Sequence, residues 1–206
     1  MRSKAGMFLV ALTFTMLLVL SSAMIRGQDS SARSSNTPAG TQPAGTQMDK
    51  GSTKMMKSPD AKFAIMAAQG GMAEVQLGQL AAQKASSADV KAFGQQMVDD
   101  HSRANDQLKS VAQGQGMTLP TSLNAKDQAL YTKLQGLSGA NFDKTYVKAM
   151  VKDHQEDVKE FQKEGDTGKD PQIKNFASQT LPVLQQHLSK IQSIQSSMGG
   201  GSAPGK

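Results

Sequence analysis

The sequence predicts an all-α protein, an antiparallel four-helix bundle, and three observations support this prediction. Four long segments between residues 59 and 198 repeat their apolar residues at helical spacing, and no segment alternates apolar and polar residues as a half-buried strand does. Two pairs of these segments are separated by only a few residues, which makes the members of each pair antiparallel neighbours. The chain has no cysteine, so its core must be stable without disulfides or thiolate-bound metals.

The first two predicted helices form one hairpin. The first begins with Ser58 as its N-cap and Pro59 in its first turn, a combination that favours a helix start. The second begins at Ser86, and Asp89 follows three residues later as in a capping box. The apolar residues of the two segments are Phe63, Met66, Ala67, Gly70, Ala73, Leu77, Leu80 and Ala81, then Val90, Phe93, Met97, Ala104, Leu108 and Val111.

The third and fourth predicted helices form a second hairpin. The third begins near Asn141 and ends at a short turn at residues 165–169. The fourth opens with Asp170 and Pro171, and Pro182 should interrupt and kink it. Their apolar residues are Phe142, Tyr146, Met150, Val158 and Phe161, then Ile173, Phe176, Leu184, Leu188, Ile191 and Ile194.

A long crossover joins the hairpins. It covers residues 113–140 and carries a predicted short helix near residues 126–135. Two hairpins with one long crossover are the ferritin-like arrangement. The second and third long segments also repeat one pattern 53 residues apart: Phe93, Met97, Val98, Asp100, His101 and Leu108 match Tyr146, Met150, Val151, Asp153, His154 and Phe161.

Residues 1–26 have the composition of an export segment. Arg2 and Lys4 precede an uncharged, mostly apolar run over residues 5–25, and Arg26 ends it. A basic start, an apolar run and small residues near Ala23 are typical of a signal peptide cleaved after that alanine. The run is also long enough to stay in the membrane as an N-terminal anchor and tether. Both alternatives place the rest of the chain in the periplasm or cell envelope.

The rest of the chain divides by composition and charge. Residues 27–58 are rich in Ser, Thr, Pro and Gly and predict a disordered linker; residues 59–198 form the bundle, and residues 199–206 a flexible tail. Between Pro59 and Ser196 there are fifteen basic and fifteen acidic residues, so the net charge of +6 lies outside the bundle. A neutral bundle without tryptophan argues against nucleic acid as a partner.

Ionisable residues recur on the inner faces of the predicted helices. The second, third and fourth helices each place one histidine there, and the first places Glu74. Buried charges need partners or a metal ion, and imidazole with carboxylate suits Fe, Zn, Cu or Mn. The candidate metal ligands, with the aspartates as ligands or as their hydrogen-bond partners, are Glu74, Asp100, His101, Asp153, His154 and His187.

Two other interpretations of these residues stay open. Di-iron bundles place an acid and a histidine three residues apart on one helix, whereas here they are adjacent, which also fits a metal-free hydrogen-bond network. Met97 with His101 and Met150 with His154 could instead bind Cu(I), although methionine is also ordinary core filler. No nucleophile elbow or phosphate loop is present, so we name no catalytic residue, and the Gly-Gly pair at residues 70–71 indicates close helix packing.

The chain also resembles a known family. The resemblance lies in residues 63–80 (FAIMAAQGGMAEVQLGQL), 90–105 (VKAFGQQMVDDHSRAN), 142–154 (FDKTYVKAMVKDH) and 176–188 (FASQTLPVLQQHL). These segments are similar to exported bacterial ferritin-like domains known as domain of unknown function four-one-four-two. The resemblance implies a ferritin-like bundle behind a signal or membrane segment and no established activity. The ferritin pattern of Glu followed by Glu-x-x-His is absent here.

Two functions therefore fit the sequence. The first is a non-enzymatic envelope or stress-related protein, whose bundle offers a surface to an envelope partner or to a second copy of itself. The alternative is a metal-binding or redox protein that uses the inward histidines and carboxylates with a transition metal such as Fe, Zn or Cu.

Overall fold

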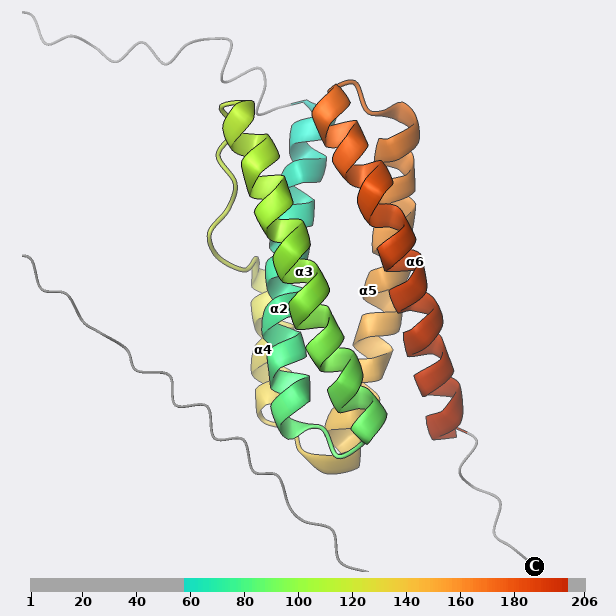
Figure 1. Cartoon of the computed structure of the whole chain (residues 1–206). Helices are drawn as coiled ribbons and strands as arrows, with labels where there is room; N and C mark the ends of the chain where they lie inside the picture. Colours follow the sequence, from blue (N-terminus) through green and yellow to red (C-terminus); the bar gives the residue numbers. More distant parts are fainter. Residues whose placement is uncertain (1–57, 200–206) are drawn as a thin grey trace, which may run out of the picture. The chain divides into compact units, whose positions relative to one another are not determined.

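The computed structural model describes residues 58–199, and these residues form a bundle of helices without a strand (Figure 1). The helices are α2 (Pro59–Lys84), α3 (Ala88–Gly114), α4 (Ala125–Gln135), α5 (Gly139–Thr167) and α6 (Pro171–Gly199). The all-α prediction is confirmed. The predicted leader, the linker up to residue 57 and the tail from residue 200 lie outside the described residues. Within residues 58–199, no helix is long and apolar enough to cross a bilayer.

The four long helices form two antiparallel hairpins, as predicted. Helix α2 packs mainly against α3, and α5 mainly against α6, while α3 also contacts α6 and α2 contacts α5. The short helix α4 lies in the crossover and packs on α2 and α5 (Figure 1). The hairpins therefore face each other: α3 lies beside α6, and α2 lies beside α5.

Two of the predicted helix starts are confirmed by their capping hydrogen bonds. The hydroxyl oxygen of Ser58 accepts from the Ala61 amide at 3.0 Å. A carboxylate oxygen of Asp170 accepts from the amide of residue 172 at 2.9 Å and from that of Ile173 at 3.0 Å. In both helices the next residue is a proline, which needs no amide partner in the first turn.

The predicted start of α3 at Ser86 is wrong by one residue. Ser87 is the N-cap, and its hydroxyl accepts from the Val90 amide at 3.5 Å. Ser86 is engaged elsewhere, because its amide donates to Asp143 at 3.0 Å and its hydroxyl donates to the same carboxylate. Competition from a distant acid thus decides which serine caps the helix.

Helices α5 and α6 also differ from the prediction. Helix α5 begins at Gly139 rather than near Asn141, and it continues through Gly165 to Thr167. A Cβ atom on Gly165 would lie 2.9 Å from the hydroxyl of Ser178, so this glycine permits close packing of α6 and does not form a turn. Helix α6 is continuous through Pro182, because one missing backbone hydrogen bond is outweighed by apolar packing on both sides of the proline.

Two buried aspartates join the hairpins reciprocally. Asp60, at the start of α2, accepts from the amide of Lys169 in the α5–α6 turn at 2.8 Å. Asp143, near the start of α5, accepts from the amides of Ser86 and Ser87 in the α2–α3 turn at 3.0 and 2.8 Å. Each hairpin thereby binds the turn of the other. These contacts fix the position of one hairpin along the bundle axis relative to the other.

The helices of the first hairpin approach most closely at two glycines. A Cβ atom on Gly78 would lie 2.6 Å from the carbonyl oxygen of Gly94, and one on Gly94 would lie 2.7 Å from that of Gly78. Of the predicted packing pair at residues 70–71, Gly71 lies under the side chain of Asn105, whereas nothing lies within 4 Å of a Cβ atom on Gly70. That prediction is right for one glycine and wrong for the other.

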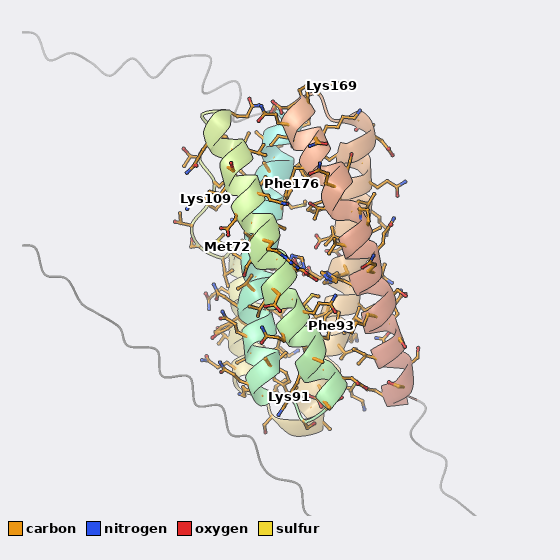
Figure 2. All side chains as sticks on the ribbon, viewed as in Figure 1. Met72, Lys91, Phe93, Lys109, Lys169 and Phe176 are labelled. Carbon is orange, nitrogen blue, oxygen red and sulfur yellow. The ribbon has the colours of Figure 1, made fainter. Side chains whose placement is uncertain are left out.

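The core consists of two apolar clusters. One cluster includes Phe93 and Tyr146, and the other includes Phe161 and Phe176. Figure 2 shows side chains with nitrogen and oxygen atoms in the middle of the bundle, between the labelled Phe93 and Phe176. The two clusters therefore enclose a polar layer.

Candidate metal centre

Each long helix contributes one ionisable side chain to the polar layer. Glu74 comes from α2, and the three histidines come from α3, α5 and α6. Their exposed fractions are 1% for Glu74, 5% for His101 and 0% for both His154 and His187. The prediction from helical periodicity that these four side chains point inward is therefore confirmed.

One nitrogen of each imidazole ring lies beside an oxygen acceptor. Nδ1 of His101 is 2.8 Å from Oε2 of Glu74, and Nε2 of His187 is 2.8 Å from Oδ2 of Asp100. Nδ1 of His154 is 3.0 Å from the backbone carbonyl oxygen of Met150. In a neutral ring, the nitrogen beside an acceptor carries the proton and the other nitrogen keeps its lone pair.

The opposite nitrogen of each ring is buried without a hydrogen-bond partner. These atoms are Nε2 of His101, Nε2 of His154 and Nδ1 of His187, and Oε1 of Glu74 is buried and unpartnered as well. Oε1 of Glu74 lies 3.3 Å from Nε2 of His154, but no hydrogen bond joins them. Each of the four helices thus presents one unsatisfied ligand atom in the same layer, although buried polar atoms normally have partners.

The spacing of the rings fits a shared ion. One nitrogen from each of His101, His154 and His187 lies within 4.8 Å of the other two. The ring centroids are 5.4, 5.4 and 5.9 Å apart. A zinc ion about 2.0–2.1 Å from three imidazole nitrogens places the ring centroids roughly 5.2–5.5 Å apart, which is close to the observed centroid distances.

Burial keeps the three imidazoles neutral. It lowers the pKa of His101 to about 4 and, with help from the two neighbouring histidines, that of His154 to about 3. Burial also lowers the pKa of His187, although its bond to Asp100 opposes the effect. Neutral imidazole is the form that binds metals, so the rings are ready as ligands at neutral pH.

A group of carboxylates adjoins the histidines. Glu74, Asp153 and Asp157 each offer an oxygen atom, and the three oxygens lie within 4.8 Å of one another. Burial first, and then the neighbouring acids, raises the pKa of Glu74 and of Asp157 well above the usual range. Burial likewise raises the pKa of Asp153 to about 6. The charged forms of these acids are therefore costly unless a cation is present.

Two cavities border the polar layer. A small cavity of about 20 Å³ is lined in part by Glu74, His101, Asn105 and Asp157. A larger cavity of about 220 Å³ between α3 and α6 is lined in part by Asp100, His101 and His187. The larger cavity is a route by which an ion or small molecule could reach the histidines.

The structure separates the six predicted ligands by position. Glu74 and the three histidines come together, Asp100 lies behind His187 as its hydrogen-bond partner, and Asp153 belongs to the carboxylate group. Sequence reasoning missed Asp157, although it lies three residues from His154, the acid–histidine spacing of di-iron bundles in the reverse order. Met97 and Met150 lie in an apolar cluster, as their interpretation as core filler predicts.

Comparison with known proteins identifies the family of this chain. A family profile described as a domain of unknown function, DUF4142, matches residues 45–194. The chain therefore belongs to the DUF4142 family, as its resemblance predicted. A search of curated proteins found no match.

Two solved structures share the fold. One is a DUF305 protein from Streptomyces coelicolor, described as a candidate secreted protein, with a TM-score of 0.60, 12% identity, and coverage of 73% of this chain and 98% of the other. The second is a DUF305 fragment from Deinococcus radiodurans, with a TM-score of 0.60, 12% identity, and coverage of 68% of this chain and 97% of the other. At this identity the likeness concerns the fold.

Proposed function

We propose that this protein binds a divalent transition-metal ion in the middle of its bundle, with His101, His154 and His187 as ligands and Glu74 beside them. One observation carries the proposal: four buried ligand atoms, one from each long helix, have no hydrogen-bond partner and lie in one layer. Leaving a buried polar atom unsatisfied costs roughly 1–3 kcal/mol, so four such atoms together favour a bound cation.

The hydrogen bonds behind the ligands support the proposal. Histidine ligands of metals usually donate their second N–H to a carboxylate or a backbone carbonyl, which fixes the tautomer and the ring orientation. Here the acceptors are Glu74, Asp100 and the Met150 carbonyl. All three rings meet this requirement, and a purely apolar role for the histidines would not need it.

The types of ligand narrow the choice of metal ion. Three imidazoles favour Zn²⁺, Cu²⁺ or Fe²⁺ over Mg²⁺ or Ca²⁺, which prefer oxygen ligands. The S. coelicolor protein that shares the fold is described as a candidate secreted protein, and residues 1–26 have the composition of an export segment. We therefore place the bound ion outside the cytoplasm, in the periplasm or cell envelope.

Elemental analysis of the full chain purified without chelators tests the proposal. We expect about one equivalent of transition metal, or of Zn²⁺ after loading and dialysis, in the unsubstituted protein. His101→Gln and His154→Gln should each remove most of it, whereas Lys109→Ala, an exposed change on α3, should not. A protein that retains no metal after loading, or glutamine variants that retain as much as the parent, would refute the proposal.

A metal-free network is the second candidate, and one contact favours it. The raised pKa of Glu74 allows this acid to be protonated, and Nε2 of His154 is 3.3 Å from its free oxygen. In that case the layer would be a structural feature of a non-enzymatic envelope protein. Identical melting temperatures with EDTA and with added Zn²⁺, Cu²⁺ or Fe²⁺ would favour this candidate over metal binding.

A further inference from the structure

We propose that a second divalent cation binds beside the histidine centre, held by the carboxylates of Glu74, Asp153 and Asp157. The inference extends the proposed function, because Glu74 would be shared between the two ions. The proposed ligands of the second ion, however, are all oxygen atoms, and two of them come from residues outside the histidine centre.

The backbone places the three carboxylates together. Asp153 and Asp157 are four residues apart on α5, so they lie on one face of the helix, and that face is turned toward Glu74 on α2. Their nearest oxygens lie within 4.8 Å of one another. Three carboxylates at this separation form a ligand set for one cation.

Unsatisfied atoms beside the carboxylates point to a ligand as well. Oε1 of Glu74, whose residue is 1% exposed, has no hydrogen-bond partner. The hydroxyl of Tyr146 is buried and unpartnered as well, and the charges of Glu74 and Asp153 add to burial in raising the pKa of this phenol. An ion bound to the carboxylates would satisfy the free oxygen of Glu74.

Space for an ion exists beside these carboxylates. The small cavity of about 20 Å³ has Glu74 and Asp157 in its wall, together with the side-chain amide of Asn105. A volume of roughly 10–15 Å³ is enough for a single water molecule, so the cavity admits one small ion or one ion-bound water. Gly71 leaves room for the side chain of Asn105 in this wall, because a Cβ atom on Gly71 would lie 2.1 Å from the Asn105 side-chain oxygen.

The ammonium group of Lys126 does not take the place of the proposed second cation. The charge of Lys126 acts on Asp153, but its ammonium nitrogen pairs with Glu156 at 3.5 Å. The side chain of Lys126 is 66% exposed, so it stays at the surface. The buried oxygen of Glu74 is therefore left without a cation from the protein in this part of the structure.

The ligand types predict that the two positions prefer different ions. A site of carboxylate oxygens favours Mn²⁺, Fe²⁺, Mg²⁺ or Ca²⁺, whereas the three imidazoles favour Zn²⁺ or Cu²⁺. Mn²⁺ is the most useful probe for the second position, because the resonance of the free ion is visible by electron paramagnetic resonance.

The test titrates Mn²⁺ into the full chain that has been loaded with one equivalent of Zn²⁺. We expect loss of the free Mn²⁺ signal corresponding to about one further equivalent. Asp157→Asn and Asp153→Asn should each weaken Mn²⁺ binding at least tenfold while Zn²⁺ stays bound. Glu160→Gln, which removes an exposed acid further along α5, should change the binding of neither ion; circular dichroism checks that each variant is folded.

The outcomes separate the two proposals. If the parent protein takes up no Mn²⁺, or if Asp157→Asn and Asp153→Asn bind it as well as the parent does, the second position is refuted while Zn²⁺ binding stands. If Zn²⁺ is not retained but Mn²⁺ binds and requires Asp157, the histidine centre is refuted and the carboxylate position stands.

Discussion

Asp100 is bonded to His187 on α6, with 2.8 Å between Oδ2 and Nε2, although its neighbour in the sequence is His101. The acid–histidine pair that the sequence suggests is therefore formed between hairpins. Burial acts to raise the pKa of Asp100, but bonds from His187, Arg103 and Gln96 outweigh it and lower the pKa. Asp100 is thus an ionised acceptor that orients the ring of His187.

Replacing Asp100 with asparagine should weaken metal binding without removing it. The amide cannot provide the same charged acceptor, and loss of such a partner typically lowers metal affinity by about 10–100-fold. Competition against a zinc-binding dye would measure the change. Asp99→Asn, at the exposed position next to it, is the matched control and should keep the parental affinity. Equal affinities for the two variants would show that Asp100 does not position the ring.

Metal removal should destabilise the fold. An ion that binds only the folded state, at a free concentration one hundred times its dissociation constant, adds about 2.7 kcal/mol to the free energy of unfolding. We therefore expect EDTA to lower the melting temperature of the parent protein in calorimetry. His154→Gln should melt at one temperature whether or not Zn²⁺ is present; a Zn²⁺-dependent shift of the same size in this variant would contradict the assignment.

Glu164, away from the metal centre, should make stability depend on pH. Burial and the nearby carboxylates of Asp60 and Asp170 raise its pKa to about 7. The folded state therefore holds a proton that the unfolded state has released, so this residue lowers stability as pH rises from about 4.5 to about 7. Its contribution changes by at most about 1.4 kcal/mol per pH unit, and it is constant outside this range.

Glu164→Gln isolates this effect. The stability of the variant relative to the parent should increase between pH 4.5 and 7 and then level off, when both are unfolded by urea in the presence of EDTA. The difference between the two proteins removes the contributions of the histidines and the other acids. A difference that does not vary with pH would exclude Glu164 as the source.

Two glycines of α2 should respond oppositely to alanine. Gly78→Ala should lower the free energy of unfolding by about 1–3 kcal/mol, because its Cβ atom would collide with the backbone of Gly94. Gly70→Ala should raise it by up to about 1 kcal/mol, because alanine favours a helix and no atom lies within 4 Å of its Cβ position. Chemical unfolding of both variants tests the pair, and destabilisation of similar size would show that helix packing is not the cause.

Local sequence signals predicted much of the fold. A capping residue followed by proline set the starts of α2 and α6, since both effects act within one helical turn. Helical spacing placed Glu74 and the three histidines inside, because burial of a face follows from its own apolar residues. Signals of this kind need no knowledge of the neighbouring helices.

The sequence predictions are wrong where contacts between residues far apart in the sequence determine the structure. Ser86 and Ser87 are equivalent as caps until the hydroxyl of Ser86 donates to Asp143. Gly165 reads as a turn residue until the contact with Ser178 is known. The bond between Asp100 and His187 depends on the rotation of α3 relative to α6, which no single helix specifies. Asp157 is different, because its spacing from His154 was a usable signal in the sequence itself.

The division of the polar layer between hairpins has a consequence for assembly. Glu74 and His101 belong to the first hairpin, and His154 and His187 to the second, so neither hairpin alone carries more than two of the four groups. A nascent or cleaved chain with one folded hairpin therefore lacks a complete coordination sphere. On the proposed function, capture of the ion would require the two halves to have docked, and a retained ion would mark a chain that has finished folding.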